Sequence, residues 1–209
     1  MDSIKRALLL SPHTDDAELG AGAVISRLAR QGVEISSVTF SFCEESTPVG
    51  FPVGCLKDEC IAAMEVLGIS DVRILDYPVR GFDRFRQDIL EDLIRLRTEI
   101  QPDLILTPAS TDCHQDHEVI HNESVRAFKN STILGYIFPW NSLKTRPNVT
   151  VDVEPVDVET KINALACYHS QSDRNYFSPE VINAALIVAG SSVGVKYAEA
   201  FECIRFRLR

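Results

Sequence analysis

The chain has 209 residues, and its 21 Lys and Arg against 30 Asp and Glu give a formal net charge of −9. Its 45% apolar and 24% charged residues are typical of a folded globular protein and exclude a disordered chain. The negative charge argues against nucleic acid as the main partner, because phosphate binding requires a basic surface. At this length we expect one domain, residues 1–209, with a single large core.

No early segment predicts a membrane span or a secretory leader. The longest early apolar run, residues 7–10, is far shorter than the roughly 20 residues of a spanning helix or the about 7–15 residues of a leader. We therefore expect a cytoplasmic protein without an integral membrane segment. The six cysteines include no C-x-x-C pair, which argues against a zinc site built on cysteine.

Short apolar runs alternate with helical patterns in the first half of the chain. We expect strands at residues 6–11, 33–42 and 72–75, helices at 18–31 and 57–67, and a long loop over 43–54. Gly32 and Gly68 are placed to close the two helices. Two prolines and two glycines favour the loop.

The second half of the chain repeats this alternation. We expect helices at residues 86–100, 117–129, 160–169 and 179–189, and strands at 103–107, 133–138, 149–153 and 199–207. Strands separated by helices of this length indicate βαβ units. The sequence therefore predicts a single Rossmann-like α/β domain, with a mostly parallel sheet flanked by helices and a site at the strand C-termini.

A first polar cluster, His13-Thr14-Asp15-Asp16, directly follows the first predicted strand. In open α/β sheets, ligands bind beyond the carboxyl ends of the strands. Imidazole and carboxylate are ligands that zinc prefers, and a second carboxylate beside them can act as a base. The alternative is structural: Asp15 or Asp16 caps the following helix, and His13 is a polar loop residue.

A second cluster, residues 112–117, follows the predicted strand at 103–107, and three of the five histidines (His114, His117 and His121) lie in or beside it. A metal-bound imidazole usually bonds a carboxylate through its other nitrogen, and Asp112 and Asp116 are candidates for that role. The alternative is a helix N-terminus, where acidic residues are favoured. Two clusters at strand ends of one sheet together favour a metal site.

These motifs resemble the PIG-L/LmbE-like zinc-dependent N-deacetylases, the N-acetylglucosaminyl deacetylase-like family. The resemblance rests on His13-Thr14-Asp15-Asp16 and on His114-Gln115-Asp116-His117, each after a buried strand. Further landmarks follow in family order: Glu59 with Leu67-Gly68, Tyr168-His169-Ser170-Gln171 and Ala198-Glu199-Ala200-Phe201. Thr14 and Ala17 stand where the family often has Pro and Glu, and Leu56-Lys57-Asp58 replaces a frequent arginine.

The resemblance implies a metal-dependent hydrolase that removes an N-acetyl group from an amino sugar or sugar conjugate. It assigns Zn²⁺, or another divalent first-row metal, to His13, Asp16 and His117. It makes Asp15 the general base, His114 the oxyanion stabiliser or proton donor, and Asp116 the support of a histidine ring. It also implies that the protein binds a small N-acetylated sugar as its substrate. The resemblance does not decide whether the protein forms a homo-oligomer.

Two other functions compete with this interpretation. His117-Glu118-Val119-Ile120-His121 matches the H-E-x-x-H pattern of zinc proteases, in which both histidines bind zinc and the glutamate is the base. That hypothesis leaves the first cluster without a role. The second alternative is a metal-binding or sugar-binding module without turnover, although Asp15 and His114 are both present.

Three further features carry two interpretations each. Arg80 and Arg84 flank a loop that either contacts an anionic part of the substrate or is solvated surface. Trp140 either stacks on a sugar ring or belongs to the core. His169 either has a functional role or caps the end of a helix.

Overall fold

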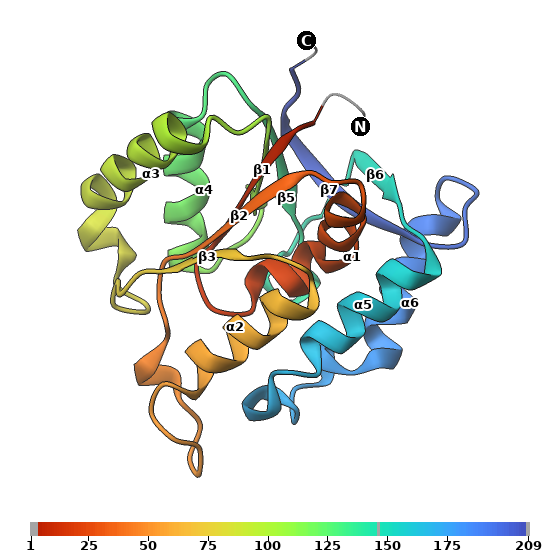
Figure 1. The fold of residues 1–209 in the computed structure, drawn as a ribbon, viewed down its shortest axis with the longest axis horizontal. Helices are drawn as coiled ribbons and strands as arrows, with labels where there is room; N and C mark the ends of the chain where they lie inside the picture. Colours follow the sequence, from red (N-terminus) through yellow and green to blue (C-terminus); the bar gives the residue numbers. More distant parts are fainter. Residues whose placement is uncertain (1–3, 146, 208–209) are drawn as a thin grey trace.

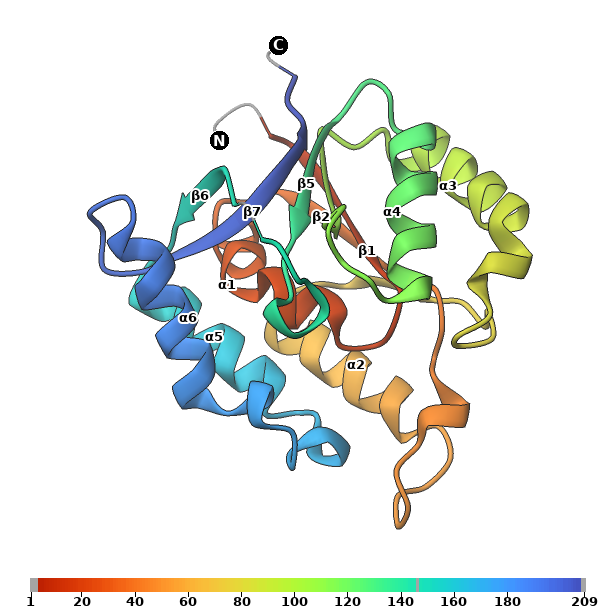
Figure 2. The ribbon, with the colours of Figure 1, turned by 180° about the vertical axis from the view of Figure 1, so that it is seen from behind.

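A computed structural model describes residues 4–145 and 147–207, and it contains one seven-stranded sheet in the order β3-β2-β1-β4-β5-β7-β6 (Figures 1 and 2). The strands are β1 (Arg6–Ser11), β2 (Glu34–Thr39), β3 (Asp71–Ile74), β4 (Leu104–Pro108), β5 (Thr132–Tyr136), β6 (Val149–Asp152) and β7 (Ala198–Arg205). The expected α/β architecture is therefore confirmed.

Helices cover both faces of the sheet. They are α1 (Asp16–Arg30), α2 (Cys55–Val66), α3 (Arg86–Ile100), α4 (Gln115–Ala127), α5 (Pro155–Leu165) and α6 (Pro179–Ser191). Short 3₁₀ turns lie at Glu44–Ser46, Phe82–Phe85, Pro139–Asn141, His169–Gln171 and Asn175–Phe177. Figures 1 and 2 show α3 and α4 on one face, and α1, α2, α5 and α6 on the other. In the described part of the chain, no helix has both the length and the apolar character that a membrane span requires.

The sheet departs from the parallel pattern at one edge. Strands β3, β2, β1, β4 and β5 pair in parallel, whereas β7 runs antiparallel to both β5 and β6. The mostly parallel prediction is thus correct, and the final strand is inserted between two earlier ones. This insertion is not visible in the sequence, because each strand pattern is local and carries no information about its partner.

Two helix boundaries differ from the prediction because of capping. The helix expected at residues 160–169 begins at Pro155, since Glu154 and Asp157 form a reciprocal capping box at its N-terminus. The helix expected at 117–129 begins at Gln115, because the His114 ring accepts the N–H of Asp116. The second difference places His114 at the junction between loop and helix.

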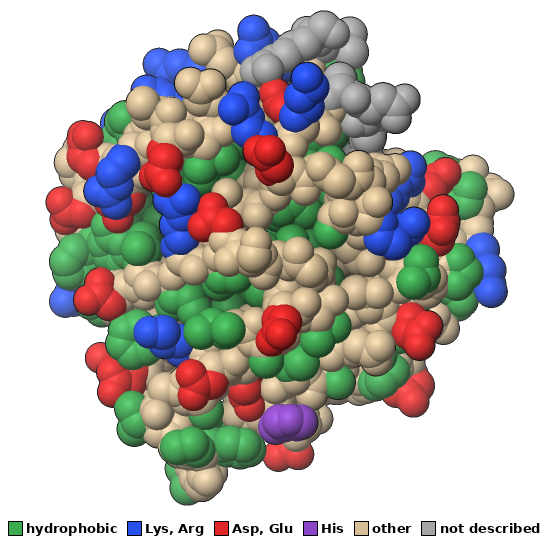
Figure 3. Space-filling model, viewed as in Figure 1, with side chains coloured by type: hydrophobic (Ala, Val, Ile, Leu, Met, Phe, Trp, Pro, Cys, Tyr) green, Lys and Arg blue, Asp and Glu red, His purple; other side chains and the backbone are tan. Residues whose placement is uncertain are grey.

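Strand β1 lies in the middle of the sheet and is buried on both faces. Ala7 and Leu9 belong to the core beneath α1, α2, α5 and α6, and Leu8 and Leu10 to the core beneath α3 and α4. All four side chains are 0% exposed, which explains the continuous apolar run in the sequence. The surface is mixed in charge: Figure 3 shows acidic and basic side chains interspersed over the described part of one face.

Helix α1 packs unusually close to the sheet and to α5. A Cβ atom at Gly20 would lie 2.5 Å from the Tyr136 ring, and one at Gly22 would lie 2.8 Å from Lys161 Cγ. Tyr136 also donates a hydrogen bond to Leu10 O of β1, at 2.9 Å. These contacts hold α1 against β1, so the turn that joins them has little freedom.

A buried ion pair links α1, α5 and β7. Lys161 Nζ donates to Glu199 Oε1 and to Leu19 O, each at 2.7 Å. The Glu199 carboxylate also accepts the N–H groups of Ala23 at 3.1 Å and Val24 at 2.7 Å. Both charged residues are buried, so each depends on these partners for the hydrogen bonds that water would otherwise supply.

We predict that Lys161→Met destabilises the protein by about 3–5 kcal/mol, because it leaves the Glu199 carboxylate buried without its cation. Urea unfolding measures the loss. The matched control is Lys57→Met on the exposed face of α2, which should change stability by less than about 0.5 kcal/mol. Equal stabilities for the two variants would show that the ion pair does not hold the three elements together.

Candidate active site

The two polar clusters of the sequence meet at one cavity. It has a volume of about 270 Å³, and its lining includes His13, Asp15, Asp16, His114 and His117. The first cluster follows β1 and the second follows β4, and these strands are neighbours in the sheet. The expected location at the carboxyl ends of the strands is therefore correct.

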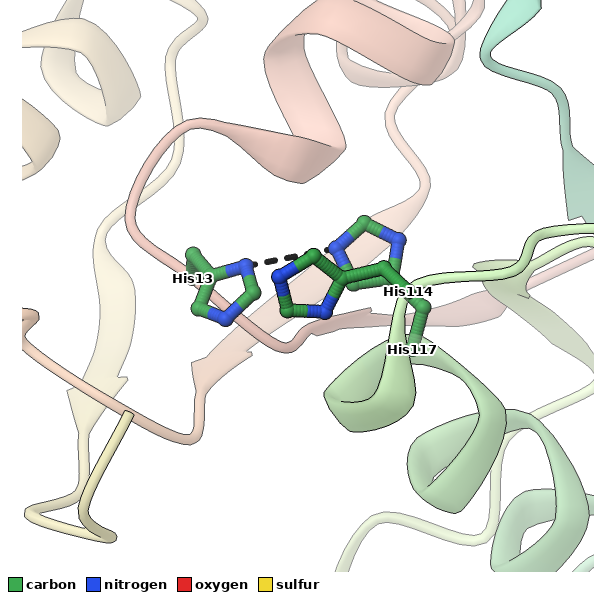
Figure 4. A group of neighbouring side chains, drawn as sticks. All are labelled: His13, His114 and His117. Atoms are coloured by element: carbon green, nitrogen blue, oxygen red, sulfur yellow. Dashed lines mark hydrogen bonds between the residues drawn. The ribbon is translucent and has the colours of Figure 1, made fainter. Parts of the chain in front are cut away.

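Three side chains converge at the floor of this cavity. His13 Nδ1 lies 3.2 Å from Asp16 Oδ2 and 3.2 Å from His117 Nε2, and His117 Nε2 lies 3.4 Å from Asp16 Oδ1. Figure 4 shows the rings of His13, His114 and His117 gathered at this point. Side chains from the start of α1 and the start of α4, about a hundred positions apart in the chain, thus lie together.

The opposite nitrogen of each imidazole bonds a carboxylate. Asp116 Oδ2 lies 3.0 Å from His13 Nε2, and Asp112 Oδ2 lies 2.7 Å from His117 Nδ1. In a neutral ring the single N–H donates to the carboxylate, so the remaining nitrogen presents a lone pair to the converging point. Two lone pairs and the Asp16 carboxylate then face one another.

This donor set fits a divalent metal ion. Ligand atoms about 2.0–2.1 Å from a tetrahedral zinc ion lie about 3.3 Å from one another. The two imidazole nitrogens lie 3.2 Å apart, and they lie 3.2 and 3.4 Å from the two oxygens of Asp16, which agrees with that spacing. His13, His114 and His117 also form a histidine group in which one ring nitrogen of each lies within 4.8 Å of the others.

The site attracts positive charge. Burial lowers the pKa of His13 and His117, but the Asp16 charge and hydrogen bonds to Asp116 and Asp112 outweigh it, raising the pKa values to about 9 and about 10. Burial raises the pKa of Asp16, but the two imidazoles hold it well below its usual value. A metal ion bound at this point would displace these protons.

Asp15 occupies the N-cap position of α1 without capping it. Its side chain makes no capping hydrogen bond, so the structural alternative from the sequence is wrong for this residue. Burial and the charge of Asp16 raise the pKa of Asp15 to about 6, although His13 and Arg174 lower it in part. A carboxylate with this pKa can accept a proton near neutral pH.

His114 is held as a neutral hydrogen-bond donor. Its Nδ1 accepts the N–H of Asp116 at 3.2 Å, so the ring hydrogen is at Nε2. Burial and the charges of His13 and His117 lower the pKa of His114 to about 4. Of the two roles implied by the resemblance, oxyanion stabilisation by a neutral N–H agrees with this environment, and a resting imidazolium does not.

The Asp116 carboxylate positions a loop as well as a histidine ring. It is fully buried, and besides His13 it accepts the backbone N–H groups of Arg80 at 2.6 Å and Phe82 at 3.3 Å. Arg80 has a φ of 66°, in the left-handed region that non-glycine residues seldom adopt. The loop at residues 80–82 and the His13 imidazole are therefore held by the same carboxylate.

The segment 168–171 supports the loop that carries the first cluster. Tyr168 Oη contacts Thr14 O and lies 2.7 Å from Glu18 Oε1, and both side chains are buried. A hydroxyl has one hydrogen, so if it is given to the Thr14 carbonyl, Glu18 must supply the hydrogen of the other contact. Burial raises the pKa of Glu18 to about 8, which agrees with a protonated acid.

Several cavity residues were uncertain in the sequence or absent from its analysis. Trp140 is stacked between Phe138, at 5.1 Å between ring centroids, and Tyr176, at 4.3 Å, so both of its faces are covered. It is 47% exposed and therefore not a core residue. Arg174 and Tyr176 line the cavity and were not predicted, since they lie in an irregular segment without periodicity.

The remaining candidates from the sequence are divided between the cavity and the surface. Arg80 and Gln171 line the cavity, whereas Arg84 and His169 are exposed and are not among its lining residues. His121 Nδ1 bonds Pro108 O at 2.9 Å, and Glu118 is exposed outside the cavity. The H-E-x-x-H arrangement is therefore not formed, because its two histidines bond to different parts of the protein.

Comparisons with known proteins agree on one family. The PIG-L family, described as GlcNAc-PI de-N-acetylase, matches residues 8–128. A protein of Escherichia coli named as the uncharacterized deacetylase YaiS is 29% identical over 174 residues, covering 79% of this chain and 91% of that protein. Diacetylchitobiose deacetylase of Thermococcus kodakarensis is 22% identical over 231 residues, covering 98% of this chain and 84% of that protein.

A solved structure shows the breadth of the fold. The 4-carboxy-2-hydroxymuconate hydratase GalB of Pseudomonas putida superposes with a TM-score of 0.80 at 22% identity, covering 99% of this chain and 98% of that protein. This likeness establishes the fold and not the reaction. The reaction must be argued from the side chains in the cavity.

We predict that His13→Ala and His117→Ala lose most of the bound divalent metal, because each removes one of three converging ligands. Elemental analysis after dialysis measures the metal content. Glu118→Gln and His121→Ala are the matched controls on α4 and should retain it. Loss of metal in His121→Ala with retention in His13→Ala would reverse the ligand assignment.

We predict that Glu18→Gln removes a pH dependence of stability from the metal-free protein. The pKa of Glu18 is raised from 4.5 to about 8, so its contribution is fully present below pH 4.5 and is lost as the pH rises through 8. Within that window the wild type should lose up to about 1.4 kcal/mol per pH unit relative to the variant. Thermal unfolding with a chelator tests this, and parallel curves for the two proteins would refute it.

Proposed function

The chain belongs to the PIG-L family, and we propose that it is a metal-dependent hydrolase that removes an N-acetyl group from an amino sugar or a sugar conjugate. The observation that carries the proposal is the convergence of His13, Asp16 and His117, with a carboxylate behind each imidazole. Relatives support the substrate class, since one of them is named diacetylchitobiose deacetylase. We infer that residues 1–209 form one deacetylase domain. Residues 1–3 and 208–209 at its two ends lie outside the described residues.

In this proposal His13, Asp16 and His117 hold one divalent ion, which we infer to be zinc. Two nitrogen ligands and one carboxylate form a set of three protein ligands, the number found in catalytic zinc sites. When bound, zinc acts as a Lewis acid and lowers the pKa of a bound water towards about 7. Asp112 and Asp116 keep the two imidazoles in the tautomers that bind metal.

Asp15 acts as the general base. It takes a proton from the attacking water, for which its pKa of about 6 is suited. His114 donates a hydrogen bond from Nε2 to the oxygen of the attacked amide and so stabilises the developing negative charge. Because an amine leaves poorly unless protonated, the proton collected by Asp15 must reach the nitrogen before the C–N bond breaks.

Asp116 and Tyr168 act through other residues. Asp116 fixes the His13 ring and the loop at 80–82, and Tyr168 fixes the carbonyl of Thr14 between His13 and Asp15. The cavity volume of about 270 Å³ lies just below the usual range for small-molecule sites, about 300–1,000 Å³. We infer that this small cavity receives one sugar ring with its acetamido group.

The cell compartment is a separate inference. All six cysteines are free in the structure, three of them buried. Free thiols are typical of proteins in a reducing environment, and we infer a cytoplasmic location on that basis.

We predict that Asp15→Asn retains the metal and loses about 10²–10⁴-fold in turnover, because it keeps the shape of the side chain and removes the base. His114→Ala should also retain the metal and lose about 10²–10³-fold, because it removes a donor to the oxyanion. Acetate release from a panel of N-acetylated sugars, with metal analysis of each preparation, measures both effects.

The controls are Asp58→Asn and His169→Ala, which change the same residue types at exposed positions outside the cavity. Both should keep wild-type turnover. Metal retention without acetate release from any substrate would favour a binding module, and wild-type turnover by a fully metal-loaded Asp15→Asn protein would refute the assigned base.

A further inference from the structure

Two arginines line the cavity without a carboxylate partner. In the described part of the chain, the guanidinium groups of Arg80 and Arg174 take part in no ion pair. Their hydrogen bonds go to neutral oxygens, Ser46 Oγ for Arg80 at 3.1 Å and Tyr176 Oη for Arg174. Both residues are exposed, so their remaining N–H groups are free to bind a ligand.

Arg80 is held at the cavity by its backbone. Its φ of 66° is unfavourable for a side chain with a Cβ atom, and the conformation is maintained by the N–H bond to Asp116 at 2.6 Å. The same carboxylate orients His13, so the position of Arg80 is fixed relative to the candidate metal ligands.

Arg174 lines the cavity from the position just before the 3₁₀ turn Asn175–Phe177. Its guanidinium is 5.8 Å from the centre of the Tyr176 ring, and that ring stacks on Trp140. Arg174 lines the same cavity as Asp15, the candidate base. Arg174 is thus oriented by aromatic contacts rather than by an ion pair.

The surroundings are otherwise acidic. The chain has a net charge of −9, and four carboxylates, Asp15, Asp16, Asp112 and Asp116, lie in the cavity or directly behind it. An anionic ligand would be repelled by this arrangement unless cationic groups met it locally. Apart from the histidines, of which His13 and His117 are already paired with these carboxylates, Arg80 and Arg174 are the cationic side chains among the lining residues.

We propose that the substrate carries an anionic group, a carboxylate or a phosphate, beside its N-acetylated sugar ring, and that Arg80 and Arg174 bind it. The inference rests on the proposed deacetylase function and narrows its substrate class. Guanidinium groups bind both kinds of oxyanion through paired N–H donors. Carboxylate and phosphate share this chemistry, and the binding experiment distinguishes them by using one ligand of each kind.

Binding is measured without turnover in the Asp15→Asn background, through the fluorescence of Trp140, the only tryptophan of the chain, which lines the cavity. The ligands are N-acetylglucosamine, N-acetylglucosamine 6-phosphate and N-acetylmuramic acid, which are neutral, a phosphate and a carboxylate. We expect at least one anionic ligand to bind about tenfold or more tightly than the neutral sugar. Added salt should weaken that preference.

Arg80→Met and Arg174→Met keep the length of the aliphatic stem and remove the charge. Each should weaken binding of the preferred anion by about tenfold and change binding of the neutral sugar by less than about twofold. Arg84→Met, an exposed arginine of the same loop outside the cavity, is the matched control and should change neither.

Equal losses for neutral and anionic ligands would overturn the inference, because the arginines would then only balance the four carboxylates. The absence of any preference for an anion in the parent protein would overturn it as well. The failure of this inference can be distinguished from the failure of the deacetylase proposal. Preferential binding of an anion by a protein that releases no acetate would refute the deacetylase proposal alone. Acetate release by a protein that binds anionic and neutral sugars equally would refute the anionic substrate alone.

Discussion

The arrangement of the site depends on one electrostatic constraint. The acceptor atoms of His13, Asp16 and His117 lie 3.2–3.4 Å from one another, and only a cation can stabilise them there. Asp16 supplies the charge, and Asp112 and Asp116 hold each imidazole by its far nitrogen. Without positive charge at their centre these groups would repel one another. Protons or a metal ion meet this need, which explains why the pKa values of His13 and His117 are raised despite burial.

The scaffold keeps these groups together by close packing. Gly20 and Gly22 allow α1 to lie against Tyr136 and Lys161, and Tyr136 bonds to the end of β1. Tyr168 then fixes the turn between β1 and α1 from the opposite part of the fold. Rigid support of this kind matters because a catalytic group displaced by about 1 Å can lose about a hundredfold in rate.

Neighbouring side chains of the same chemical type have different pKa values because their environments differ. Asp15 and Asp16 are adjacent in the chain, yet the pKa of Asp15 is raised to about 6 and that of Asp16 is held well below its usual value, because only Asp16 contacts the imidazoles. His114 and His117 differ likewise, with pKa values lowered to about 4 and raised to about 10. This divergence supports the proposed roles of Asp15 as base and Asp16 as ligand, and of His114 as neutral donor and His117 as ligand.

The sequence by itself determined the alternation of strands and helices, the α/β class, and the position of two polar clusters at strand ends, because periodicity and turn residues are local properties. Only the tertiary structure decided that β7 enters the sheet antiparallel, that His121 bonds Pro108 rather than a metal, and that Arg174 and Tyr176 reach the cavity. It also decided which nitrogen of each histidine faces the site. These outcomes depend on contacts between residues far apart in the chain and on the burial of charge that such contacts produce, and no local pattern encodes either.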